Sequence, residues 1–76
     1  MDDAVLDSAT KCEAGRLLAQ IRRADSMIVA VMAGATAEGF VLGLEMAGAL
    51  RAGDAENLYL VFESALQQRL KILITC

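Results

Sequence analysis

The chain has 76 residues, of which 57% are hydrophobic and 22% are charged, and its formal net charge is −3. This length supports one domain with a small core, and the apolar content exceeds the roughly 45–50% that is usual for soluble domains. The negative charge counts against nucleic acid as a partner, because an acidic protein repels phosphate backbones.

The residue types favour helix along the whole chain. Pro, His and Trp are absent, and Ala, Leu, Met, Glu, Gln and Arg, which are good helix formers, dominate. Strands would need more β-branched and aromatic residues. We therefore predict an all-α fold, either a small three-helix antiparallel bundle or a long helical hairpin, completed by oligomerisation.

The first predicted helix covers 10–33 and follows an acidic tail at 1–9. Thr10 and Glu13 have the spacing of a capping box, in which each side chain accepts a hydrogen bond from an otherwise unpaired backbone N–H group. Apolar residues then recur at steps of three and four, as on one face of a helix. This apolar face consists of Ala14, Leu17, Ile21, Ala24, Ile28, Val31 and Ala35.

The second predicted helix covers 36–52. A first helix continued in phase would bring Glu38 and Glu45 into its own buried face. We therefore place a break at Gly34, because glycine tolerates the left-handed conformation that ends helices. The alternative is a break at Asp25-Ser26, which makes 27–52 one helix of about 39 Å.

The third predicted helix covers 55–75. Gly53 and Asp54 mark its start, with Asp54 as the N-cap. One face carries Leu58, Val61, Phe62, Ala65, Ile72, Leu73 and Cys76. Leu60, Leu70 and Ile74 lie on or beside the polar side, where a monomer would leave them in water.

Glu38, Glu45 and Arg69 are the charged residues with unusual positions. The two carboxylates are seven residues apart and share a helix face, but carboxylate-bridged metal sites in helical bundles also recruit His. We therefore predict no catalytic residue, no metal site and no cofactor. Arg69 falls on the apolar face of the third helix, so it either pairs with Glu38 or Glu45, within the chain or between subunits, or reaches water through a bend.

Cys12 and Cys76 are predicted to be free thiols. In an up-down-up bundle they lie at opposite ends, roughly 30 Å apart, which is beyond the reach of a disulfide. Gly39 and Gly43 are four residues apart, a spacing that lets another helix approach closely.

The segment 27–50 is also long enough to span a bilayer, and Arg22, Arg23 and Arg51 flank it. Glu38 at its centre opposes insertion by about 3 kcal/mol. The acidic start of the chain does not resemble a secretory signal. The expected location is therefore cytoplasmic, and a single-span membrane protein is the second alternative.

We predict a non-enzymatic cytoplasmic protein that self-associates, first as a homodimer, and acts by binding another macromolecule as a regulator, inhibitor or chaperone-like accessory protein. An alternative is an oligomer that sequesters a small anionic ligand at subunit interfaces, with Met27, Met32, Met46 and Tyr59 lining the pocket. An enzyme is the least supported class, because Glu38, Glu45 or Cys12 would have to react without a histidine. The predicted assembly residues are Phe40, Leu44, Leu58, Leu60, Phe62, Leu70 and Ile74, and the predicted partner-binding residues are Arg16, Arg22 and Arg23.

Overall fold

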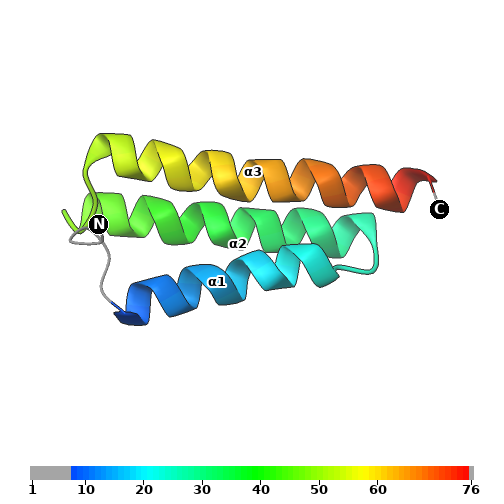
Figure 1. Cartoon of the computed structure of the whole chain (residues 1–76), viewed down its shortest axis with the longest axis horizontal. Helices are drawn as coiled ribbons and strands as arrows, with labels where there is room; N and C mark the ends of the chain where they lie inside the picture. The colour runs from blue at the N-terminus through cyan, green and yellow to red at the C-terminus, as the bar shows by residue number, and fades with distance from the viewer. Residues whose placement is uncertain (1–7, 76) are drawn as a thin grey trace.

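The computed structural model describes residues 8–75, and these form three α-helices. They are α1 (Ser8–Arg23), α2 (Met27–Met46) and α3 (Ala52–Thr75). Each helix runs antiparallel to the one before it, and every pair of helices is in contact (Figure 1). The all-α prediction is confirmed for these residues. Ser8 and Ala9 belong to α1, and the rest of the predicted tail lies outside the described residues, as does Cys76.

The first break in the helices lies at 24–26, so the predicted helix 10–33 and the break at Gly34 are corrected. Ser26 has an extended backbone (φ −147°, ψ 161°), and its hydroxyl accepts a hydrogen bond from the Val29 N–H at 3.2 Å. This is an N-cap, which satisfies a donor that the first turn of α2 leaves unpaired. Because Ser8 is already helical, Thr10 lies inside α1 rather than at its N-cap.

Gly34 lies in the middle of α2, where it faces α3. A Cβ atom at this position would lie 2.8 Å from Cδ2 of Leu66. Such a distance is closer than ordinary van der Waals contact, so the glycine lets the two helices approach each other. The residue that the sequence suggested as a helix end is therefore a packing residue.

The second break follows α2 at Gly48, which has a positive φ of 76°. The Gly48 N–H donates to the Glu45 carbonyl at 3.1 Å, and the Ala49 N–H donates to the Leu44 carbonyl at 2.9 Å. This pair of bonds is a Schellman motif, whose left-handed position favours glycine. The predicted helix 36–52 is therefore corrected at both ends, and Gly53 and Asp54 lie inside the first turn of α3.

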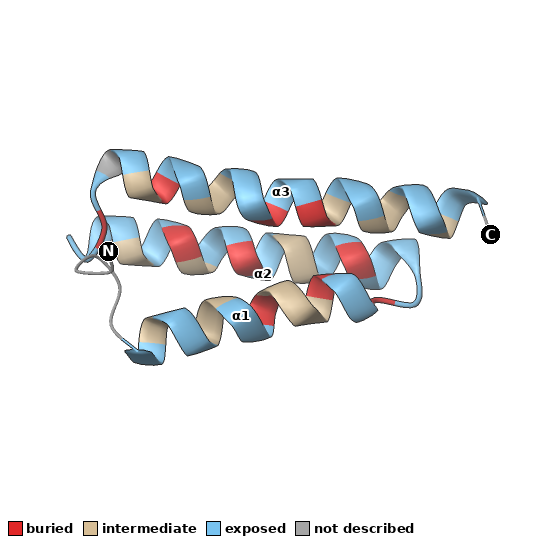
Figure 2. Ribbon diagram, viewed as in Figure 1, coloured by how far each residue is buried: buried red, intermediate tan, exposed pale blue. Residues whose placement is uncertain are grey.

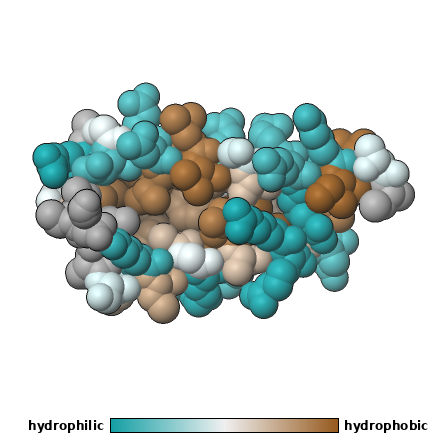
Figure 3. Space-filling model, in the orientation of Figure 1, coloured by the Kyte–Doolittle hydropathy of each residue, from teal (hydrophilic) through white to brown (hydrophobic). Residues whose placement is uncertain are grey.

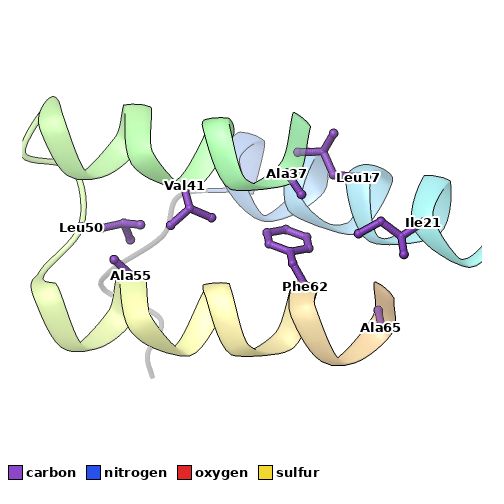
Figure 4. Packing of buried hydrophobic residues seen from close by; sticks show 8 residues of the cluster. All are labelled: Leu17, Ile21, Ala37, Val41, Leu50, Ala55, Phe62 and Ala65. Carbon is purple, nitrogen blue, oxygen red and sulfur yellow. The ribbon is translucent and has the colours of Figure 1, made fainter. Parts of the chain in front are cut away.

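The core lies between the three helices and contains mostly small or medium side chains. Phe62 of α3 is its one aromatic member, and its ring points toward α1 and α2 (Figure 4). The inward side of α2 contributes only Ala30, Ala37 and Val41 as buried residues. The main cluster consists of Leu17, Ile21, Ala37, Val41, Leu50, Ala55, Phe62 and Ala65.

Arg69 connects α3 to the end of α1. Its Nε donates a hydrogen bond of 2.7 Å to the backbone carbonyl of Ala24, and the contact is partly buried. A carbonyl at a helix C-terminus lacks a partner within the helix and carries partial negative charge, so a guanidinium is a suitable donor. Within residues 8–75 Arg69 makes this contact and not the predicted ion pair with Glu38 or Glu45.

Candidate functional site

The outward face of α2 is the most unusual surface of the molecule. Four of its large apolar side chains are exposed: Ile28 by 73%, Met32 by 62%, Leu42 by 51% and Met46 by 81%. Figure 2 shows how little of α2 is buried. We call the following residues, which follow one another at alternating steps of four and three, the α2 seam: Ile28, Met32, Ala35, Gly39, Leu42 and Met46.

The α2 seam has the heptad spacing of a coiled-coil contact stripe. At 3.6 residues per turn, the buried residues Ala30, Ala37 and Val41 lie about 180° around the helix axis from the seam. The seam is therefore on the opposite side of α2 from the core. The seam itself contains no charged side chain. Ala35 and Gly39 at its centre are small, so a second helix can approach closely there.

The flank of the seam next to α3 is acidic. A groove of about 400 Å³ lies between α2 and α3, and Glu38, Tyr59 and Glu63 are among its lining residues. The pKa of the Tyr59 phenol is raised, first by desolvation and then by the negative charges of Glu45 and Glu38. This flank therefore gathers three carboxylates beside an apolar groove.

The flank next to α1 has a different charge pattern. Gln20, Arg23 and Asp25 line the groove between α1 and α2, together with Met32 of the seam. Arg16 lies on the same face of α1, seven residues before Arg23. Arg16 forms an exposed ion pair with Glu13, and this hydrogen bond lowers the pKa of the Glu13 carboxyl.

The structure distributes the seven predicted assembly residues between the core and the surface. Phe62 is buried in the core of the single chain, so it is not an exposed contact residue. Phe40, Leu44 and Leu58 are partly buried against that core, and Leu70 is half-buried. Leu60 and Ile74 are exposed, by 59% and 66%. Figure 3 shows apolar side chains at the surface, including some near the C-terminal end of α3.

The three predicted partner-binding arginines do not form one patch. Arg22 lines a groove with Leu60 and Val61 of α3, whereas Arg23 lines the groove on the α2 side of α1. Arg16 is engaged with Glu13. Arg22 therefore lies on the α3 side of α1, and Arg23 lies on the α2 side.

Tyr59, which was predicted to line an anion-binding pocket between subunits, lies in a groove that is acidic within the single chain. Two carboxylates, Glu38 and Glu63, line it, and like charges repel. In residues 8–75 no three His, Cys, Asp or Glu side chains lie close enough together to hold a metal ion. Cys12 is exposed near the start of α1. The start of α1 and the end of α3 lie at opposite ends of the bundle (Figure 1).

By length and composition α2 is also apolar enough to cross a membrane. Such helices in soluble proteins are mostly buried, but α2 is mostly exposed. Exposed apolar side chains on α2 are a feature of surfaces that contact another protein or lipid.

Sequence reasoning missed the α2 seam, although its spacing is visible in the sequence. The apolar face predicted for the first helix ran through Ile28 and Ala35, which belong to the seam, because the break was placed at Gly34. With the break at Ser26, that face ends at Ala24 and α2 starts with an independent phase. Ser26, an exposed serine of the type that caps helices, is the residue in the sequence that marks the boundary between the two helices.

Comparison of the chain with protein-family models, with curated proteins and with solved structures gives no match.

Proposed function

We propose that the protein is a non-enzymatic interaction protein that self-associates through the α2 seam. The observation that carries the proposal is the heptad row of exposed apolar side chains from Ile28 to Met46, which has no charge on it. Full burial of a Leu, Ile or Met side chain contributes about 1.5–3 kcal/mol. The burial of the four large seam residues in each of two copies therefore contributes enough free energy to offset the free-energy cost of the entropy lost on association.

On this proposal the side of the bundle away from the seam remains accessible in the assembly. There α1 and α3 form a second groove, which Arg22, Leu60 and Val61 line. A protein that presents such a surface twice acts as a regulator, inhibitor or chaperone-like accessory protein, by occupying a surface on another macromolecule. This role needs no catalytic group.

The test is light scattering of the purified protein, without detergent, over a range of concentrations. We expect a dimer for the natural sequence and a monomer with unchanged helix content for Leu42→Glu, because the new carboxylate would lie in the contact between copies. Leu60→Glu is the matched control, since Leu60 is similarly exposed but lies on α3. It should leave the dimer intact. A monodisperse monomer of the natural sequence, or a dimer that Leu60→Glu but not Leu42→Glu dissociates, would overturn the proposal.

A single-span membrane protein is the second candidate, and the exposure of a 20-residue apolar helix favours it. About 20 apolar residues suffice to cross the hydrocarbon core. Glu38 and Glu45 lie within this helix, and each opposes insertion. Fractionation of cells without detergent separates the two candidates: the interaction protein remains in the supernatant, whereas a spanning protein sediments with the membranes and is released by detergent.

A further inference from the structure

The flanks of the α2 seam differ in charge, and this difference bears on how two copies can pair. The flank next to α3 carries Glu38, Glu45 and Glu63. The flank next to α1 carries Arg23 and Asp25, with Arg16 and Glu13 further along the same helix. One flank is therefore purely acidic and the other contains both signs of charge.

Two arrangements let a second copy cover the seam with two-fold symmetry. In a parallel pair the axis runs along the helices, and each α3 flank lies beside the α1 flank of the other copy. In an antiparallel pair the axis is perpendicular to the plane of the two α2 helices, and the two α3 flanks lie on the same side. The same distinction determines which flanking residues meet in parallel and antiparallel coiled coils.

The charges favour the first arrangement. An antiparallel pair would gather Glu38, Glu45 and Glu63 of both copies along one edge of the contact, where like charges repel. A parallel pair would place these carboxylates opposite the α1 flank, where Arg16 and Arg23 offset the negative charges of Glu13 and Asp25. Arg16 lies seven residues, about 10 Å, from Arg23 toward the middle of the bundle, which is the part of α2 that contains Glu38.

We propose that two copies pair in parallel through the α2 seam, so that the acidic α2–α3 groove of each copy is completed by the arginine-bearing face of α1 from the other. This inference rests on the proposed self-association and adds the orientation and the composite groove. Each copy then supplies residues to two identical grooves, one on either side of the two-fold axis. The central Ala35 and Gly39 face their own counterparts in the second copy.

Disulfide trapping tests the orientation, with Cys12 and Cys76 replaced by Ser. Ile28→Cys and Met46→Cys are made separately, at positions 18 residues or about 27 Å apart on α2. A parallel pair brings each residue against its own counterpart, within the short Cα separation that a disulfide requires. We therefore expect each variant alone to form a covalent dimer under mild oxidation, as seen on a non-reducing gel.

The outcomes separate this inference from the proposal on which it rests. A monomer in light scattering overturns both. A dimer that forms covalent species only when Ile28→Cys and Met46→Cys are mixed overturns the parallel orientation and leaves self-association through the seam. A dimer that forms no covalent species in either case overturns the seam as the contact.

A charge substitution tests the orientation independently, because it should change the dimer dissociation constant in opposite directions for parallel and antiparallel pairs. Glu38→Gln removes an attraction in the parallel pair, so its dimer should dissociate about two- to fivefold more readily, in keeping with the small energies of exposed charge pairs. In an antiparallel pair the same change removes a repulsion and tightens the dimer. Asp54→Asn is the matched control and should leave the dissociation constant unchanged, because Asp54 shares a face of α3 with Val61, which lines the groove away from the seam.

Discussion

The two faces of α2 are both apolar, but they have different sizes of side chain and different environments. The buried face consists of Ala30, Ala37 and Val41, and beside them Gly34 lets Leu66 approach closely. The outward face carries the larger Ile28, Met32, Leu42 and Met46, which remain exposed. Small residues thus set the short distance between helices within the chain, while the larger hydrophobic surface of the helix remains free for a contact outside it. Apolar character alone therefore does not identify the core side of this helix.

The largest expected effect is a loss of folding when glutamate is placed on the buried face of α2, compared with the same substitution on the outward face. Val41→Glu places a carboxylate at a site that is fully buried, which destabilises the fold by several kcal/mol. A chain of this size has only about 4–11 kcal/mol of stability, so we expect loss of the helical circular dichroism signal at 25 °C. Leu42→Glu at the neighbouring position should remain helical. Equal loss of helix in both variants would remove the distinction between the two faces.

A smaller loss of stability is expected when the partly buried hydrogen bond between Arg69 and Ala24 is removed. Arg69→Met removes the hydrogen bond to the Ala24 carbonyl, and we expect the free energy of unfolding to fall by about 1–2 kcal/mol. Urea denaturation followed by circular dichroism measures this change. Lys71→Met, at an exposed position, is the control and should stay within about 0.5 kcal/mol of the parent. Matching values for the two variants would show that the Ala24 contact contributes no stability.

The glycines of the two faces provide a finer comparison. A Cβ at Gly39 meets no atom within 4 Å, whereas a Cβ at Gly34 lies 2.8 Å from Leu66. Gly39→Ala should therefore stabilise the folded chain by about 0.5–1 kcal/mol through helix propensity. Gly34→Ala should gain less, because the Leu66 side chain must move. Thermal melts in the Leu42→Glu background measure both without a contribution from association, and a larger gain at Gly34 would contradict the packing described for α2 and α3.

The smallest expected effect is the raised pKa of Tyr59 on the acidic flank, which a pH titration measures. Tyr59 is the one tyrosine in the chain, so the ultraviolet absorbance of its phenolate reports on this groove alone. Its pKa should lie above 10.0, because desolvation and then Glu45 and Glu38 raise it. The folded state holds this proton more strongly than the unfolded state, so stability should fall as the pH rises above 10.0 toward the folded-state pKa.

The double variant Glu38→Gln, Glu45→Gln separates the causes of that shift. It should lower the Tyr59 pKa only in part, because desolvation, the largest single cause, remains. A return to the ordinary tyrosine value would mean that the carboxylates alone perturb the phenol.

The core residues of the end helices were largely predictable, and those of α2 were not. Leu17 and Ile21 were expected on the inward face of the first helix, and Phe62 and Ala65 on that of the third; all four are buried. Val61 and Ile72, expected on the same face of the third helix, are instead exposed by 48% and 49%. In both helices polar residues occupy the opposite side, which makes the inward direction readable from the sequence. In α2 apolar residues occur on every side, so the periodicity did not indicate which of them are buried.

The helical fold follows from the amino-acid composition, because good helix formers dominate the chain and proline is absent. The composition of the segment between Met27 and Leu50 also indicates more apolar surface than a short chain readily buries. The sequence left two positions open for the end of the first helix, Gly34 and Asp25-Ser26, and the packed structure has the second. That Gly34 packs against Leu66 and that the α2 seam faces outward follow from the tertiary structure. These features depend on how closely α2 and α3 approach each other, which is a property of side-chain packing between segments that are distant in the chain.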